Sequence, residues 1–205
     1  MAEARTVDDV LKRYGPDARA RLRPHFERAG VAYPPRRVWL VGLKDERRLE
    51  LWAGDREPRH VTDYAIQAAS GEAGPKRRQG DLQVPEGVYR VLLLNPNSSY
   101  HLSMKLDYPN AFDRAKARAD KRTDLGGDIF IHGRAVSIGC LAMGDPVAEE
   151  LFVLAAEVGV GNLSAVIAPH DLRTRPAALG ATSDPAWLPE LYDILTRELR
   201  RFPRP

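Results

Sequence analysis

The only cysteine in the chain, Cys140, follows His132 closely in the segment Ile131–Met143. A thiolate attacks carbonyl carbon well, and a nearby imidazolium lowers the pKa of a thiol. Gly133 and Gly139 each lie beside one of the two reactive residues. Glycine there lets the backbone turn sharply and lets a substrate come close. These residue types, so near in sequence, predict a nucleophile–base pair for acyl transfer.

A structural role for the same residues is the alternative. A lone cysteine is usually a small buried hydrophobe, and Leu141 and Met143 could simply continue a core strand. A lone histidine is more often a hydrogen-bonding residue than a catalyst. Spacing alone leaves both interpretations open, because cysteine–histidine signatures do not transfer between families.

The order of residues in this segment resembles the YkuD family of L,D-transpeptidase catalytic domains, and within it the YafK-like short-motif branch. That branch has a histidine-glycine pair followed by Ser-x-Gly-Cys, as His132-Gly133 and Ser137–Cys140 do here. The similarity covers about residues 37–170. Its upstream parts are Gly74-Pro75-Lys76, Gly80-Asp81, Pro85–Tyr89 (with Val84 where threonine is common), Tyr100–Ser103 and Tyr108–Asn110.

Two positions depart from the longer-motif members of the family. Those members have Ser-His-Gly-Cys followed by a hydrophobic residue and arginine. Here Ile138 replaces that histidine and Ala142 replaces that arginine, so no role of those two side chains can be carried over. The first histidine of the motif, His132, is retained, and we assign it as the base.

The resemblance implies a reaction on peptidoglycan stem peptides. Cys140 would attack the carbonyl between the third and fourth stem residues and form a thioester, and an amine acceptor would then take the acyl group. Backbone N–H groups around Gly139 and Cys140 would stabilise the oxyanion. The carbonyl of Gly133 is a candidate to orient His132, and Ser137 is expected to help shape the pocket.

Two further residues are candidates for substrate binding. Arg134, directly after the His-Gly pair, could pair with a substrate carboxylate, and His101 lies within a matched patch. A solvent-facing arginine and a structural histidine are the respective alternatives. The resemblance also implies that a β-lactam of the carbapenem class would acylate Cys140.

Two other functions stay open. The same dyad passes its acyl group to water in hydrolases, so an amidase or L,D-carboxypeptidase is an alternative to a transferase. A non-catalytic cell-wall-binding module with a buried Cys140 is the second alternative.

Composition limits cofactors and partners. The chain has 205 residues, of which 43% are hydrophobic and 29% charged, and a net charge of +3, which suits an anionic partner such as a wall peptide. One cysteine excludes an internal disulfide, and no metalloprotease or phosphate-loop motif occurs, so we expect no cofactor and no metal.

Basic residues alternate with acidic ones over 113–122 without interleaved aromatics, so we expect no nucleic-acid partner. No apolar run is long enough to cross a membrane.

The first residues contain no apolar signal core. Because the family usually works outside the cytoplasmic membrane, we expect a periplasmic or otherwise exported protein, with a signal segment removed before Met1. The residues alone leave a cytoplasmic protein open as the alternative.

The periodicity of apolar residues and the positions of glycine, proline and capping residues predict the elements that must position these residues. We expect a helix over 6–29 that Pro24 breaks or bends, and a hairpin of 38–42 with 48–52. Further strands are expected near 60–68, 87–94 and 100–106, with 91–94 buried on both faces. A short strand over 128–131 should deliver His132. After it come a helix capped by Asp145, a strand over 163–169 and a last helix that begins at Asp184-Pro185.

The predicted fold is mostly β with α additions. The resemblance implies a β-sandwich-like mixed sheet with a cradled helix, to which terminal helices would be added. Residues 1–35 would form a helical appendage and residues 36–205 the catalytic domain. The insertion 107–127, with a short helix, could form a wall of the substrate groove through Lys121 and Arg122, or could be a plain surface excursion.

Overall fold

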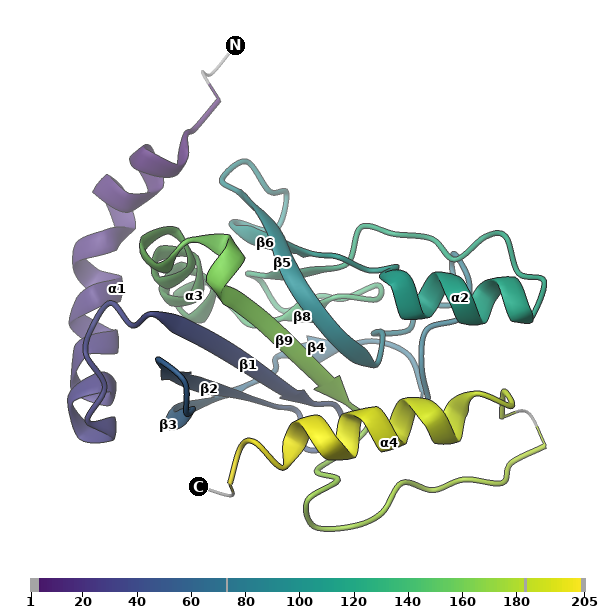
Figure 1. Ribbon diagram of the computed structural model, residues 1–205. Coiled ribbons are helices and arrows are strands. Elements are labelled where there is room, and N and C mark those ends of the chain that lie inside the picture. The colour runs from purple at the N-terminus through teal and green to yellow at the C-terminus, as the bar shows by residue number, and fades with distance from the viewer. Residues whose placement is uncertain (1–3, 73, 183, 204–205) are drawn as a thin grey trace.

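A computed structural model describes residues 4–72, 74–182 and 184–203 (Figure 1). The helices are α1 (Val7–Ala29), α2 (Ala111–Ala119), α3 (Asp145–Val158) and α4 (Leu188–Leu199), and a 3₁₀ turn spans Val160–Asn162. The strands are β1 (Arg37–Leu43), β2 (Arg48–Gly54), β3 (Arg59–Ala65), β4 (Ala68–Ala69), β5 (Gly87–Asn95), β6 (Ser103–Leu106), β7 (Phe130–His132), β8 (Leu141–Ala142) and β9 (Leu163–Ala168). This confirms a mixed sheet with terminal helices.

The strands described form one curled sheet in the order β3-β2-β1-β9-β5-β6-β7-β8-β4. β1 pairs in parallel with β9, and β7 pairs in parallel with β8, whereas the other pairings are antiparallel. The long strands β1, β2, β9 and β5 form one half of the sheet. The short strands β6, β7, β8 and β4 form the other half. His132 is the last residue of β7, and Cys140 directly precedes β8.

Helix α1 begins and ends where the sequence predicts. Thr6 and Asp9 form a reciprocal capping box, and Gly30 adopts a left-handed φ of 64° at the end, as is common at helix C-termini. The expectation that Pro24 breaks this stretch is wrong, since the helix continues through it. None of the helices in the described parts of the chain combines the length and apolarity that a membrane crossing requires.

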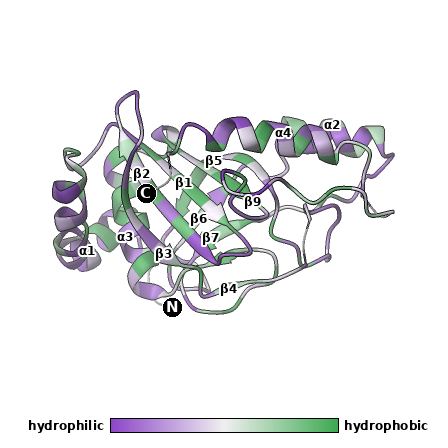
Figure 2. Ribbon diagram, turned by 90° about the horizontal axis from the view of Figure 1, so that it is seen from below, coloured by the Kyte–Doolittle hydropathy of each residue, from purple (hydrophilic) through white to green (hydrophobic). Residues whose placement is uncertain are grey.

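Strands β1, β2 and β9 are buried on both faces along most of their length, and Figure 2 colours much of this part of the sheet as hydrophobic. Trp39 and Val41 on β1 face α4, where they pack against Leu191, Leu195 and Phe202. The alternate residues of β1 belong to the main core, which α3 completes. This alternation follows from the period of two along a strand.

Helix starts differ from the sequence prediction at two places. Gly144 rather than Asp145 is the N-cap of α3, because Asp145 is already helical and its carboxylate accepts from the N–H of Arg134. The last helix begins after Trp187. Asp184 instead accepts hydrogen bonds from the N–H groups of Gly180 and Ala181, which closes a turn before the helix.

The end of β5 is more open than expected. The run 91–94 was expected to be buried on both faces, yet Leu92 is 48% exposed and Leu93 is 44% exposed. The register between β5 and β6 shifts between Val91 and Leu93, and such irregularities bend a strand away from its neighbours.

The proposed boundary near residue 35 does not separate two cores. Leu22 and Phe26 of α1 belong to the same hydrophobic cluster as Leu40 and Ile167 of the sheet. The division into an appendage over 1–35 and a domain over 36–205 therefore stays a prediction, and the helix packs as part of the common core.

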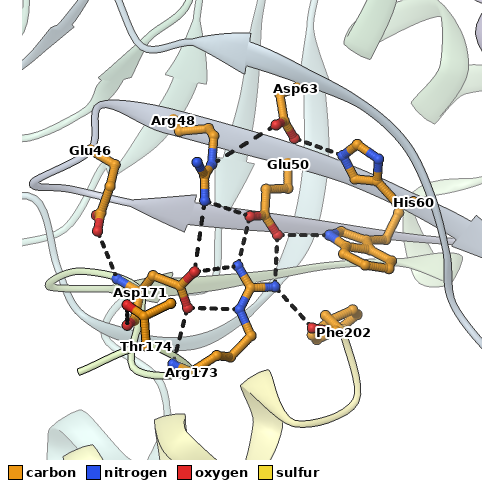
Figure 3. Close-up of polar contacts among 10 residues, drawn as sticks. Glu46, Arg48, Glu50, His60, Asp63, Asp171, Arg173, Thr174 and Phe202 are labelled. Carbon is orange, nitrogen blue, oxygen red and sulfur yellow. Dashed lines mark hydrogen bonds and ion pairs between the residues drawn. The ribbon is translucent and has the colours of Figure 1, made fainter. Parts of the chain in front are cut away.

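A buried ionic network ties the segment after β9 to β2 (Figure 3). Arg173 donates to Glu50 at 2.7 Å, to Asp171 at 2.7 Å and to the carbonyl of Phe202 at 2.9 Å. Arg48 adds a bond to Glu50 at 3.1 Å. The network joins β2, the β9–α4 connection and the C-terminal turn.

Replacing Arg173 with methionine should destabilise the fold strongly, because two buried carboxylates lose their main cationic partner and keep only the partly exposed Arg48 as a cation. We expect a loss of about 3–5 kcal/mol in the free energy of unfolding, measured by urea titration. Arg175→Met is the matched control, since the Arg175–Asp45 pair is exposed and should be worth less than about 1 kcal/mol. Equal midpoints for the two variants would contradict the importance of the network.

Candidate active site

A cavity of about 410 Å³ lies on the short half of the sheet, and both Cys140 and His132 line it. The other lining residues come from the 70–86 loop, the end of β5, the turn after it, and β6 and β7. They are Lys76, Gln79, Gly80, Leu82, Asn95, Ser98, Ser99, Tyr100, Ser103, Gly127, Asp128, Ile129, Phe130 and Ile138.

Strand pairing brings the two reactive residues together. His132 is the last residue of β7, and Cys140 directly precedes β8. The two strands run parallel, with Ile131 opposite Leu141 and His132 opposite Ala142. The loop between β7 and β8 therefore returns to the start of the neighbouring strand, and His132 and Cys140 line the same cavity.

His132 is held in one orientation. Its Nδ1 lies 2.6 Å from the carbonyl oxygen of Gly133, which requires the proton on Nδ1 and leaves Nε2 as an acceptor. The ring of Tyr100 stacks on the imidazole at 4.6 Å between centroids. Burial lowers the pKa of His132, and the bond to Gly133 acts against this shift.

Gly133 is needed at this place. A Cβ built there would lie 2.8 Å from the carbonyl oxygen of Tyr100 and 2.7 Å from Asp145. The close approach of two backbone segments explains the glycine. The predicted role of its carbonyl in orienting the histidine agrees with the geometry.

Cys140 is surrounded by backbone rather than by a charged partner. The N–H of Phe130 donates to Sγ at 3.4 Å, and Sγ lies 3.8 Å from the carbonyl oxygen of Asp128. Burial raises the pKa of the thiol, while the Phe130 bond and the charge of Lys76 act against it. No hydrogen bond joins Cys140 to His132, although both residues are among those described.

Burial disfavours the charged form of both groups and so favours a neutral thiol beside a neutral imidazole. The expectation that an imidazolium lowers the pKa of the thiol stays a prediction. The chemistry that the arrangement allows is general-base catalysis, in which His132 takes the proton as Cys140 attacks.

Ser137 fixes the loop that carries the nucleophile. Its Oγ donates to the carbonyl of Cys140 at 2.7 Å and accepts from the N–H groups of Cys140 at 3.1 Å and Gly139 at 3.3 Å. It also contacts Ser70 at 3.2 Å. The N–H groups expected to stabilise an oxyanion are therefore engaged in this structure, and their role in that step stays a prediction.

Arg134 and His101 lie outside the cavity lining. Arg134 is exposed and has a left-handed φ of 57°, and its N–H donates to Asp145. His101 contacts Glu149 at 3.0 Å and packs edge-on against Tyr14. Arg134 is therefore solvent-facing and His101 makes structural contacts, and a substrate contact by either residue stays a prediction.

The 70–86 loop forms a wall of the cavity and is held by buried charges. Lys76 pairs with Asp81 at 2.5 Å, and the same carboxylate accepts from the N–H groups of Arg77, Arg78 and Gln83. Lys44 pairs with Glu86 at 2.8 Å and also donates to the carbonyls of Gly74 and Val84. The Gly-Pro-Lys and Gly-Asp motifs therefore build this wall.

Sequence reasoning gave no role to Tyr100 or Lys76, although both stand in the matched motifs. Tyr100 directly precedes His101 in a matched patch, so its position in the motif could have drawn attention to it. Its role is visible only in the fold, because the turn after β5 brings its ring over His132. Lys76 lies in the Gly-Pro-Lys motif, but only the fold shows its pairing with Asp81.

The insertion 107–127 contributes little of itself to the cavity. Its last residue, Gly127, lines the cavity. Arg122 is engaged by Asp120 and by the carbonyl of Arg77, whereas Lys121 is exposed. The structure therefore gives Arg122 a role in supporting the 70–86 loop, and does not place the pair as charges facing substrate.

Among the residues described, no three histidine, cysteine, aspartate or glutamate side chains gather as a metal site requires.

The neutral pair predicts a characteristic pH dependence. Alkylation of Cys140 by iodoacetamide should be slow at pH 7 and reach half its maximal rate above about pH 8.5, because the pKa of the thiol is raised. Turnover should persist below about pH 6.5, since the pKa of His132 is lowered and the base stays neutral there. Half-maximal alkylation below pH 7 would instead indicate a thiolate–imidazolium pair.

His132→Ala should reduce acylation by about 10²–10⁴-fold.

Ser137→Ala should misplace the nucleophile loop, because one hydroxyl holds three backbone groups of that loop. We expect kcat to fall by about 10²-fold, the scale of a displacement of about 1 Å, with little change in the thermal midpoint. Ser99→Ala is the control, as Ser99 lines the same cavity but does not hold the loop. Indistinguishable kcat values for the two variants would disprove this role of Ser137.

Comparison with known proteins identifies the family of this chain. The model of the YkuD L,D-transpeptidase catalytic domain matches residues 36–166, which is more than half of the chain. The putative L,D-transpeptidase YafK of Escherichia coli K12 is 40% identical over 118 residues, which cover 56% of this chain and 46% of that protein. YafK of strain O157:H7 gives the same values. The matched region thus spans about half the length of these relatives.

Solved structures show the same fold. The helical cell shape determining protein Pgp2 of Campylobacter jejuni superposes with a TM-score of 0.51 at 23% identity, covering 65% of this chain and 48% of that one. A mutant of Pgp2 gives a TM-score of 0.52 at 22% identity, covering 82% and 57%. With the family model matching across β1 to β9 and the motif residues lining one cavity, the chain belongs to the YkuD family of L,D-transpeptidase catalytic domains.

Proposed function

We propose that this chain is a peptidoglycan-processing cysteine acyltransferase that forms a thioester between Cys140 and a stem peptide. The observation that carries the proposal is that Sγ of Cys140 and the imidazole of His132 line one cavity. The bond from Nδ1 to the Gly133 carbonyl leaves Nε2 as the proton acceptor. Family membership and the resemblance to YafK support the choice of substrate class.

The acylation step begins with the neutral pair. His132 Nε2 takes the proton of the Cys140 thiol as Sγ attacks the carbonyl carbon between the third and fourth stem residues. The carbon–nitrogen bond then breaks, and the imidazolium gives its proton to the leaving amine. The products are a thioester on Cys140 and a free amine, and His132 is neutral again.

The second half reverses these roles. An acceptor amine attacks the thioester carbonyl and gives a proton to His132, and the sulfur leaves and recovers that proton. The N–H groups of Gly139 and Cys140 are the proposed oxyanion donors. They now donate to Ser137 Oγ, so this hydroxyl must turn away, or share them, as the oxyanion forms.

Hydrolysis by the same thioester is a second candidate, favoured by one observation. Asp128, whose carbonyl contacts Sγ, has a side chain that is 78% exposed, so water reaches the region of the nucleophile. Capture by water would make the protein an amidase or L,D-carboxypeptidase. In either case we propose that it works outside the cytoplasmic membrane, where its substrate lies.

Incubation with purified muropeptides, read by mass spectrometry, tests the proposal. Cross-linked dimers indicate transfer to an amine, and trimmed monomers indicate hydrolysis. Cys140→Ala and Cys140→Ser should give neither product at any time point while keeping the thermal midpoint, because the atom that forms the covalent bond is gone. With a carbapenem, intact mass should show one adduct on the wild type and none on Cys140→Ala.

Two outcomes would overturn the mechanism. Product formation by Cys140→Ala would show that another group carries the reaction. A wild-type protein that retains muropeptides but never alters them would be a wall-binding module instead.

A further inference from the structure

His101 stands between two residues that hold the His132 imidazole in place. Before it, the ring of Tyr100 stacks on His132. After it, the carbonyl of Leu102 accepts from the N–H of Gly133 at 3.1 Å, and Gly133 in turn orients His132 through its own carbonyl. His101 has a left-handed φ of 74°, a conformation that persists only where the surroundings hold it. Whatever fixes the turn at His101 therefore fixes both contacts.

The His101 side chain is anchored on the side away from the cavity. Its Nε2 lies 3.0 Å from Oε1 of Glu149 on α3, and because a carboxylate only accepts, Nε2 is the donor. Arg21 of α1 donates to the other oxygen of Glu149 at 3.3 Å. Tyr14 of α1 packs edge-on against the His101 ring at 5.2 Å between centroids. Two helices therefore clamp the backbone beside the candidate active site.

The imidazole needs more than its hydrogen bond to Gly133. That bond fixes the tautomer, but a single hydrogen bond lets the ring tilt about its axis. The Tyr100 ring, inclined by 34° to the imidazole, covers one face and limits the tilt. Tyr100 lines the cavity, whereas His101 does not. A change at His101 therefore alters the position of the Tyr100 ring without removing any atom that lines the cavity.

We propose that His101 is a positioning residue, whose hydrogen bond to Glu149 sets the turn that places the Tyr100 ring on the His132 imidazole. In this role His101 touches neither substrate nor the reacting atoms. Helix α1 takes part through Tyr14 and Arg21, so the N-terminal helix supports the orientation of the base. The expected effect on turnover rests on the proposed function, whereas the orientation of the imidazole is measurable without substrate.

The kinetic test uses His101→Asn, since asparagine tolerates the left-handed backbone but does not reach Glu149. We expect kcat on purified muropeptides to fall by about 10–10²-fold, the scale of a small misplacement of a reacting group, with KM unchanged. Glu149→Ala should give the same split between kcat and KM. Glu149→Gln should keep most of the wild-type kcat, because its amide oxygen can accept the same hydrogen bond.

The substrate-free test is an NMR titration of the His132 ring, whose signal is identified by its absence from His132→Ala. Burial is the main cause that lowers the pKa of His132. In His101→Asn and Glu149→Ala the displaced Tyr100 ring lets water reach the imidazole, so we expect this pKa to rise. These variants keep the other titratable groups that line the cavity, which are Lys76, Tyr100, Asp128 and Cys140.

His60→Asn is a matched control. His60 has the same kinds of contact as His101, since its Nε2 lies 2.7 Å from Asp63 and its ring packs edge-on against Trp52 at 5.1 Å between centroids. It stands on β3, outside the cavity lining. This variant should keep the wild-type kcat and the wild-type titration of His132.

The outcomes separate the two proposals. If the wild type processes no muropeptide but the His132 titration shifts as expected, the proposed function fails and the positioning role stands. If the wild type is active and His101→Asn keeps both its kcat and its titration, the positioning role fails and the proposed function stands. Equal shifts in His60→Asn would also overturn the positioning role, by showing a general effect of a lost histidine.

The thermal midpoint of each variant shows whether it folds. If His101→Asn does not fold, the two Glu149 variants decide the question. Equal kcat values for Glu149→Ala and Glu149→Gln would then overturn the inference, because the hydrogen bond to His101 would not matter to the reaction.

Discussion

The candidate active site depends on the parallel pairing of β7 with β8. These strands are only three and two residues long, yet their register decides which side chains face the cavity. Because successive residues of a strand point to opposite faces, a slip by one residue would turn His132 into the core and Ile131 into the cavity. The core around Met104, Ile131 and Leu141 therefore specifies the site, since it penalises the slipped register with a buried imidazole.

Side-chain contacts hold the loops around the cavity, which the strand pairing does not fix. The Ser137 hydroxyl stabilises the loop that returns from His132 to Cys140, and the Lys44–Glu86 and Lys76–Asp81 pairs hold the opposite wall. At the turn after β5, Arg5 and Asn97 exchange hydrogen bonds, and Arg5 also donates to the carbonyl of His101. The segment before α1 thus secures the turn from which Tyr100 reaches the imidazole.

Much of the fold and part of the site could be predicted from the sequence. Capping residues and hydrophobic periods located α1, the β1–β2 hairpin and β9, because local chemistry decides those elements. The matched motifs pointed to Cys140 and His132, and the glycine next to the histidine has the close contacts that its position implied. Non-local packing decided the rest. The exposure of Leu92 and Leu93 follows from a register shift, and the stacking of Tyr100 on His132 follows from how a distant turn folds back.

Electrostatics was the least predictable part. A cysteine near a histidine in sequence indicates an ion pair, but the structure buries both groups without a hydrogen bond between them, and burial disfavours both charged forms. Likewise, Arg134 and His101 were reasonable candidates by position in the motif. Neither residue lines the cavity: the Arg134 backbone is left-handed, and His101 contacts Glu149.

The raised pKa of Cys140 also bears on how well the thiol resists oxidation. Peroxides and disulfides attack thiolates far faster than thiols, and oxidation of a thiolate proceeds through sulfenic acid to irreversible forms. A buried thiol with a raised pKa is anionic for little of the time, so it would be attacked slowly. The same burial would therefore protect the single cysteine of this sequence, which has no second cysteine to pair with as a disulfide.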